Sequence, residues 1–321
     1  MIREGDDSYL VFKSIWIIEN FSYCLPWMKL KSPPFTVSCL GNTKWQLIIR
    51  LRGDLDPIYI TYELCREDDD ATISIDIDFE LSFLNKDGIP LTKQKTGGSF
   101  RAKDILGFSK FLELEEITLQ KRKDFIPNDA LTARCLLWSA GIGRLEPGLC
   151  LIRSRMGLEQ SSFNWIIESF SSLQPGQKRI LQIQTTSKQV PSLSMILSLV
   201  YDDEIRIEIT QERGCETNMS DCEISLVDGA GRVVRTKRDK YFFVSKQRDK
   251  AWIFPSFLKK NYLTTKKGLY LPNDELTLKC VWKIDSGIVS HKIEEFKQYL
   301  SSNIQSIAVH MNSFDYSKEK I

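Results

Sequence analysis

The chain has 321 residues and a formal net charge of +2, with 42% hydrophobic and 27% charged residues. Such a balance is typical of folded globular proteins and excludes a disordered chain. The near-neutral charge provides no broad field for nucleic acid, and no apolar run approaches the roughly 18 residues of a membrane-spanning helix. The sequence therefore predicts a globular protein of about two domains that binds neither nucleic acid nor a membrane.

The first half of the chain alternates apolar and polar residues as β-strands do. The stretch FTVSC alternates through Phe35, Val37 and Cys39, and residues 73–83, ISIDIDFELSF, carry every second side chain apolar. Alternation over such a length predicts a strand with one buried face. The pair Asp87-Gly88 follows it, and Asp-Gly between apolar runs predicts a hairpin because both residues tolerate a positive φ.

The second half repeats this pattern and also contains two longer stretches that closely resemble stretches of the first half in sequence. Strand alternation returns in residues 204–210 and 276–282, and Asp-Gly returns at residues 228–229. The repeated stretches are SIWIIENFS and FNWIIESFSS, and later FIPNDALTARCLLW and YLPNDELTLKCVWKI. Matched Trp and Pro positions lie 149 and 145 residues apart. The sequence therefore predicts two copies of one antiparallel β-sandwich domain.

The predicted domains span residues 10–140 and 160–285, joined by a linker at 141–159. Four glycines and a proline in residues 139–160 indicate the linker. Residues 286–321 are predicted to form a helical tail, because apolar residues recur at spacings of three and four, as on one face of an amphipathic helix. These residues are Ile293, Phe296, Leu300, Ile304 and Ile307.

The reactive residues of the chain argue against an enzyme. Its two histidines, His291 and His310, lie outside both copies, which removes His-based triads and His-rich metal sites from either sandwich. The eight cysteines form no CxxC pair and are interpreted as reduced thiols. The start of the chain lacks a secretory pattern, so we expect an intracellular protein, nuclear or cytoplasmic, without cofactor or metal.

Two charge runs have alternative interpretations. The acidic run Glu67–Asp70 lacks the spaced ligands and glycine of a calcium loop, so a solvated turn is favoured. The basic run Arg232–Lys240 is interpreted as a solvated hairpin, with selection of acidic or phosphorylated peptides as the alternative.

Several motifs, in the same order in both copies, resemble the MATH (meprin and TRAF-C homology) domains of the speckle-type POZ and TD-and-POZ proteins. The first copy has the Trp-Ile opening, KWQLIIRLRGD, the Asp-Gly hairpin, GFSKFLELEEITL and FIPNDALTARC, and the second has AWIFPSFLKKNYL and YLPNDELTLKC. The resemblance covers about residues 10–140 and 160–285. It implies two TRAF-C-like, eight-stranded antiparallel sandwiches in tandem.

The resemblance also implies a function: binding a short extended peptide of a partner protein in a shallow groove. In POZ-linked members, a separate POZ (BTB) domain recruits a cullin-3 ubiquitin ligase. We find no POZ domain in this chain, so contact with cullin-3 is expected only through a POZ partner. The helix expected at 291–307 resembles the connector that would precede a POZ domain. The chain is therefore expected to be a substrate receptor without catalytic activity.

The resemblance assigns different groove residues to the two copies. Gly98 and Leu106 replace the expected Tyr and Trp in the first copy, and Glu208 and Cys222 replace the early aromatic positions in the second. The second groove is therefore expected to be aromatic at one end and polar or acidic at the other. The candidate residues are Tyr62, Phe79, Phe100 and Phe108 in the first copy, and Tyr241, Phe243, Lys250, Trp252 and Phe254 in the second.

Alternatives to a peptide receptor stay open at this point. Aromatic residues of a sandwich are commonly core residues, and this applies to Phe108 and Phe254 in particular. The chain could instead be a scaffold or oligomerisation module without a working groove. No heptads precede residue 10, so trimerisation through a coiled coil is not supported, and homo- or hetero-oligomers are left undecided.

Overall fold

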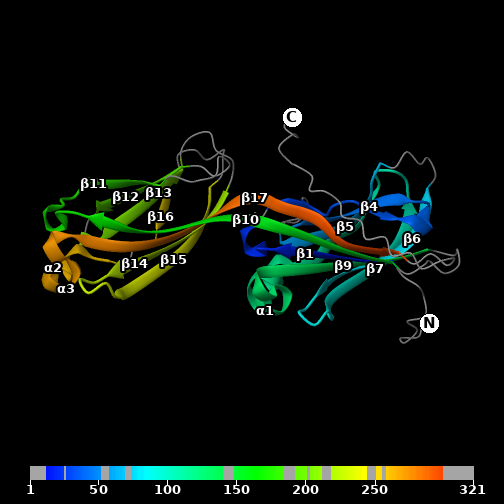
Figure 1. Cartoon of the computed structure of the whole chain (residues 1–321), viewed down its shortest axis with the longest axis horizontal. Helices are drawn as coiled ribbons and strands as arrows, with labels where there is room; N and C mark the ends of the chain where they lie inside the picture. The colour runs from blue at the N-terminus through cyan, green and yellow to red at the C-terminus, as the bar shows by residue number, and fades with distance from the viewer. Residues whose placement is uncertain are drawn as a thin grey trace. The chain divides into compact units, whose positions relative to one another are not determined.

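The computed structural model describes residues 12–24, 27–51, 58–68, 74–139, 148–183, 192–200, 203–211, 218–243, 251–254 and 258–298. Strands make up most of these residues, and the helices are single turns (Figure 1). Among the described residues, none of these helices has the length or apolarity to cross a bilayer.

The chain divides into two compact units. The first unit contains residues 1–156 and 288–321, and the second contains residues 157–287. Two long strands, β10 (Gly148–Ile167) and β17 (Leu276–Gln298), contribute residues to both units. Each unit is described separately below.

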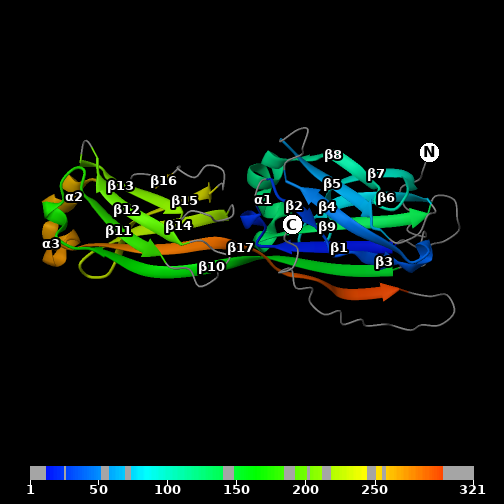
Figure 2. The ribbon, with the colours of Figure 1, turned by 90° about the horizontal axis from the view of Figure 1, so that it is seen from above.

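The first unit is a sandwich of two sheets (Figures 1 and 2). One sheet has the order β1-β9-β6-β7, with the first half of β10 parallel to β1, and the other has the order β2-β4-β5-β8, with β3 beside β4. The strands are β1 (Phe12–Glu19), β2 (Lys29–Lys31), β3 (Phe35–Val37), β4 (Thr43–Arg50), β5 (Tyr59–Arg66), β6 (Ile75–Leu84), β7 (Pro90–Phe100), β8 (Ile105–Glu113) and β9 (Ala130–Ser139). Short helices lie at Phe21–Tyr23, Ser38–Leu40, Glu116–Gln120, Arg122–Phe125 (α1) and Pro127–Asp129.

The second unit repeats this arrangement. One sheet has the order β10-β17-β14-β15, and the other has the order β11-β12-β13-β16. The strands confined to this unit are β11 (Lys178–Ile183), β12 (Leu193–Leu199), β13 (Ile205–Gln211), β14 (Asn218–Val227), β15 (Val233–Phe243) and β16 (Trp252–Phe254). Its short helices are Phe170–Ser172, α2 (Lys260–Thr265), α3 (Lys267–Tyr270) and Pro272–Asp274.

Burial follows the alternation read from the sequence. In β1, every second residue from Phe12 to Ile18 is buried, because successive side chains of a strand point to opposite faces. The inward rows of the two sheets form one apolar core in each unit. The all-β sandwich prediction is therefore confirmed.

Two predicted elements at the ends of the second copy differ from the structure. The linker predicted at 141–159 is wrong over residues 148–159, which belong to β10. The helical tail predicted at 286–321 is wrong over residues 286–298, which continue β17, and residues 299–321 lie outside the described residues. Helical periodicity is overridden here because tertiary contacts outweigh weak local propensity. Phe296 packs on Phe12, and Glu294 forms an ion pair with Arg153 at 2.9 Å.

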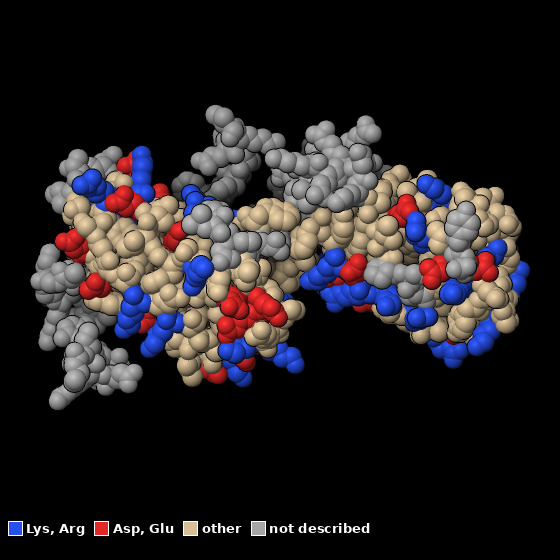
Figure 3. All heavy atoms as spheres, turned by 180° about the vertical axis from the view of Figure 1, so that it is seen from behind, with Lys and Arg blue, Asp and Glu red and all other residues tan. Residues whose placement is uncertain are grey.

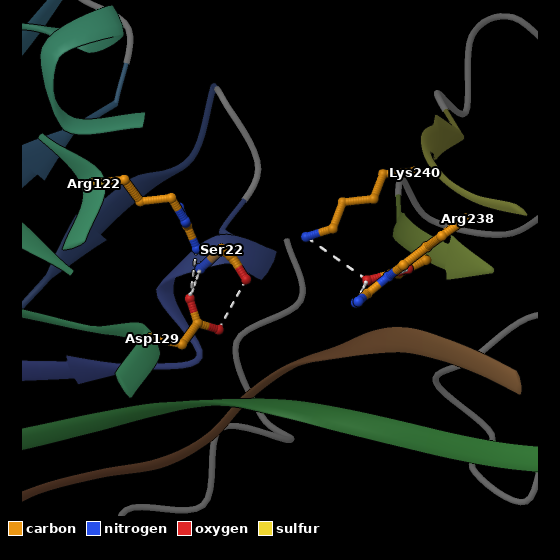
Figure 4. A network of polar contacts seen from close by, with 6 residues as sticks. Ser22, Arg122, Asp129, Arg238 and Lys240 are labelled. Atoms are coloured by element: carbon orange, nitrogen blue, oxygen red, sulfur yellow. Dashed lines mark hydrogen bonds and ion pairs between the residues drawn. The ribbon is translucent and has the colours of Figure 1, made fainter. Parts of the chain in front are cut away.

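The repeated stretches of sequence meet each other within the first unit. The backbone N–H and the hydroxyl of Ser22 donate to the two carboxylate oxygens of Asp129 at 3.1 and 2.8 Å (Figure 4). Arg122 adds a contact to the same carboxylate at 3.2 Å. Asn128 and Asp129 both have left-handed backbone, with φ of 53° and 61°. The Pro-Asn-Asp loop thus connects the start of β9 to the short helix that follows β1.

The same contact recurs in the second unit. The N–H and hydroxyl of Ser171 donate to the carboxylate of Asp274, and Lys267 lies 3.1 Å from it. Asn273 and Asp274 also have positive φ, at 56° and 65°. The sequence shared by the two copies at these positions therefore forms the same Ser–Asp contact in each unit.

Candidate functional site

Three of the predicted groove residues of the first copy lie in the core instead. Tyr62 and Phe79 are 0% exposed and Phe100 is 1% exposed. The ring of Tyr62 stacks on Phe83 at 5.3 Å, and Phe100 meets Trp45 edge-on at 5.1 Å. The prediction that these rings face a groove is wrong for this structure, because inward positions of both sheets are filled by their neighbours.

Burial leaves the hydroxyl of Tyr62 without a hydrogen-bond partner among the described residues. It also raises the pKa of this phenol well above its ordinary value. A buried unpaired hydroxyl costs about 1–3 kcal/mol. We therefore expect Tyr62→Phe to raise the free energy of unfolding by about 1 kcal/mol, measured by urea unfolding. An unchanged or lower value would show that the hydroxyl finds a partner.

The other first-copy positions, Gly98, Leu106 and Phe108, are partly exposed. Phe108 is half-buried and lies against Phe111, at 6.2 Å between ring centroids. A Cβ on Gly98 would come within 2.8 Å of Leu106, so these two residues are adjacent. Gly98 and Leu106 thus occupy the places that Tyr241 and Trp252 hold in the second unit.

Trp252 is the centre of an aromatic cluster in the second unit. It is 1% exposed, and its ring contacts Tyr241, Phe254 and Trp282 at 5.6, 5.9 and 5.7 Å. Its indole N–H donates to Asp239 at 2.9 Å. The predicted groove position is therefore wrong for Trp252 and for two further core residues, Phe243 and Phe254, which are 4% and 2% exposed.

Tyr241 is the one predicted residue of this set with an accessible ring. It is half-buried on β15 and stacks almost parallel on Trp252, with an interplanar angle of 9°. The buried indole fixes the tyrosine ring at the edge of the core. Lys250 lies outside the described residues.

The strand pairing within each unit corrects one residue equivalence that was predicted between the two copies. Tyr62 corresponds to Ile207, and Glu208 corresponds to Glu63 instead. A one-residue slip moves a side chain to the opposite face of a strand. The equivalence follows from the strand pairs, which are Tyr62–Phe108 and Glu63–Gly107 in the first unit and Ile207–Phe254 and Glu208–Ile253 in the second.

Strand β15 is the edge of its sheet and carries four accessible residues on its core-facing side. Arg235, Lys237, Asp239 and Tyr241, here called the edge row, pair with β14 residues that face the core or its margin. Arg235 and Lys237 are exposed, and Asp239 and Tyr241 are half-buried. Figure 3 shows Lys and Arg side chains gathered along the lower margin of this unit. Of the two residues expected to make one end of the groove polar or acidic, Cys222 is buried in the core and Glu208 is half-buried on β13.

The opposite face of β15 is electrostatically different. Arg238 donates two hydrogen bonds to the buried carboxylate of Asp221, at 2.8 and 2.5 Å, and Lys240 lies 3.8 Å from it (Figure 4). On the edge row, neither Arg235 nor Lys237 forms an ion pair with any described residue. The basic run RVVRTKRDK is visible in the sequence, but the division of its charges between the two faces of β15 follows only from the strand pairing.

The equivalent row of the first unit has neither charged nor aromatic side chains. Strand β7 pairs with β6 as β15 pairs with β14, which gives the row Thr92, Gln94, Thr96 and Gly98. The amide of Gln94 donates to the carbonyl of Phe111 at 3.1 Å, across to β8. Of these two rows, only the edge row of the second unit therefore carries charged and aromatic side chains.

An open pocket of about 520 Å³ lies elsewhere in the second unit. Its lining contains one ionisable side chain, Lys279, so it offers no pair of acid and base groups. Among the described residues, no group of three His, Cys, Asp or Glu is placed to hold a metal ion.

Comparison with known proteins finds similarity over the first unit. Residues 13–137 match the MATH domain family. "TD and POZ domain-containing protein 2" of Mus musculus is 29% identical over 147 residues, which are 43% of this chain and 39% of that protein. The alignment thus spans about two fifths of the relative's length. A solved structure titled "Notothenia coriiceps TRAF5" has 17% identity and a TM-score of 0.31, over 41% of this chain and 76% of that one.

Proposed function

We propose that this chain, whose residues 13–137 form a MATH domain, is a non-enzymatic adaptor that holds a short extended peptide of a partner protein against β15. MATH domains are protein-interaction modules, which supports the adaptor role. The edge row is the single observation that carries the location. It combines a half-buried tyrosine, stacked on a buried indole, with two cations that form no ion pair with any residue the structure describes.

Strand addition is the physical basis of this proposal. An edge strand presents backbone N–H and C=O groups that an extended peptide can pair with, while alternate side chains of the peptide contact the strand's own row. The main chain then supplies affinity and the edge row supplies selectivity. Tyr241 is suited to an anchoring contact, because its ring is rigid and partly apolar.

The second unit is proposed to be a second MATH domain, with domains at about residues 10–140 and 160–285. Its two sheets have the same strand order as those of the first unit. The contact between Ser171 and Asp274 also repeats the contact between Ser22 and Asp129, at the same place in the fold. The first domain, with its neutral row, would bind a different motif or act as a spacer.

From the resemblance to POZ-linked MATH proteins described above, the adaptor is proposed to act as a substrate receptor for cullin-3-type ubiquitin ligases in the nucleus or cytoplasm. The ligase would be reached through a partner that supplies a POZ domain. Homo- or hetero-oligomers that combine the two functions are part of this proposal.

Truncation of Tyr241 tests the location of the binding surface. We expect Tyr241→Ala in the full chain to weaken binding to peptides selected on an array by about fivefold or more, measured by fluorescence polarisation. Tyr262→Ala is the matched control, because Tyr262 is 45% exposed on α2 of the same unit. Equal binding by Tyr241→Ala and the parent would overturn the location.

The scaffold alternative has one observation in its favour. Six aromatic side chains that the resemblance assigns to grooves lie in the two cores. Absence of saturable binding to any arrayed peptide, with the chain folded, would support a scaffold over a receptor.

A further inference from the structure

The edge row has a charge pattern that selects among peptides. Arg235 and Lys237 are exposed, two residues apart on one face, and neither has an ion-pair partner among the described residues. On the other face, Arg238 and Lys240 share the buried carboxylate of Asp221 as an ion-pair partner. The charges of Arg235 and Lys237 therefore lie on the side of the sheet on which every second side chain of an added peptide would lie.

The spacing of these two cations matches the spacing of a β-strand. Residues two apart in a strand are separated by about 6.8 Å, so Arg235 and Lys237 face alternate residues of a paired strand. Two carboxylates at alternate positions of an extended peptide would meet both cations at once. Opposite charges facing each other across paired strands are favourable.

Asp239 divides the row into a basic part and an aromatic part. Its carboxylate accepts the indole N–H of Trp252 at 2.9 Å, which holds a negative charge between Lys237 and Tyr241. A carboxylate opposite Asp239 would be repelled, whereas a hydroxyl could donate to it. An apolar residue would follow, opposite Tyr241.

From this arrangement we infer that the second unit recognises an extended peptide with the order apolar-x-Ser/Thr-x-acidic-x-acidic, paired antiparallel to β15. The inference rests on the proposed function and adds the peptide class. The acidic groups are Asp or Glu carboxylates, which lie toward the C-terminal end of the peptide because antiparallel strands run in opposite directions. Antiparallel pairing is chosen because it is the more stable kind per residue.

The neutral row of the first unit provides an internal comparison. Thr92 and Gln94 stand where Arg235 and Lys237 stand in the second unit. This row of the first unit therefore lacks the two cations that would face acidic residues of an added peptide. Acidic peptides should engage one unit only, with a stoichiometry of one peptide per chain.

The test uses the full chain and three fluorescein-labelled peptides. The first is Leu-Thr-Ser-Thr-Glu-Thr-Glu, the second has both Glu replaced by Gln, and the third has the reversed order. We expect the first peptide to bind about tenfold more tightly than either of the others at low salt. The preference should shrink as salt is raised, because exposed charges are screened.

Charge reversal locates the preference. Arg235→Glu with Lys237→Glu should remove the preference for the acidic peptide. Lys178→Glu with Lys279→Glu makes the same change of net charge at exposed positions of the same unit and should leave the preference intact. An unchanged preference in the first double variant, or equal loss in both, would overturn the inference.

The outcomes separate the inference from the proposed function. Binding of neutral and acidic peptides with equal affinity, weakened by Tyr241→Ala, would overturn the acidic motif and leave the receptor role standing. Binding of none of the peptides, and of no arrayed peptide, would overturn both. Preference for the reversed peptide would overturn the antiparallel order.

Discussion

Trp252→Ala is expected to lower the free energy of unfolding of the second unit by about 3–5 kcal/mol. The side chain is 1% exposed and contacts four aromatic rings, so its removal leaves a large cavity. It also deprives the Asp239 carboxylate of the indole N–H. Hydrogen exchange of residues 205–211 and 276–284, compared with residues 59–66 of the first unit, would report the loss for the second unit alone.

The first unit contains a control for this substitution. Leu106 occupies the equivalent position and is 37% exposed, so Leu106→Ala is expected to cost less than about 1 kcal/mol. Trp252→Phe should give an intermediate loss, because it keeps part of the packing but not the hydrogen bond. A Trp252→Ala variant as stable as the parent would contradict the core assignment. Trp252 would then again be a candidate for the peptide-binding surface.

The burial of Trp252 determines how a loss of peptide binding in a Trp252 variant is interpreted. Loss of peptide binding in Trp252→Ala would follow from unfolding as readily as from a lost contact. Tyr241 is half-buried, so its truncation perturbs the surface with a smaller effect on the core. Mutations at the edge row, not in the aromatic cluster, therefore test the receptor role.

Strand alternation and repeated motifs were sufficient to predict the sandwich. Residues 73–83 and 204–210 alternate because one face is buried, and the structure buries that face over the described parts of both. The repeated Pro-Asn-Asp and Trp-Ile stretches predicted two copies, and their contact within each unit explains why both stretches persist. These features are local, so a single sequence contains them.

The site could be predicted only in part, because it depends on which face of a strand a residue occupies. The basic run was visible, but the division between Arg235 and Arg238 requires the pairing with β14. Burial of Trp252 depends on packing between sheets, which sequence spacing does not define. The strand at 291–298 was missed because contacts with residues such as Arg153 and Phe12, distant in sequence, determine it.

Asp274→Ala is expected to destabilise the second unit by about 2 kcal/mol. Hydrogen bonds to a charged group contribute about 1.5–3 kcal/mol, and Ser171 donates two to this carboxylate. The Lys267 contact adds little, because its side chain is 51% exposed. Alanine also tolerates the φ of 65° less well than aspartate. Urea unfolding with hydrogen exchange of residues 276–284 would measure the loss.

The pH dependence of this loss separates the charge from the loop geometry. The Ser171 hydroxyl and the Lys267 ammonium lower the pKa of Asp274 below its ordinary value of 3.8. The stabilisation is therefore fully present above about pH 4 and is lost as the pH falls through the lower folded pKa. Asp274→Asn keeps a residue that accepts positive φ but lacks the charge. Its deficit relative to the parent should therefore be present at pH 7 and shrink below pH 4, whereas a constant deficit would assign the effect to geometry alone.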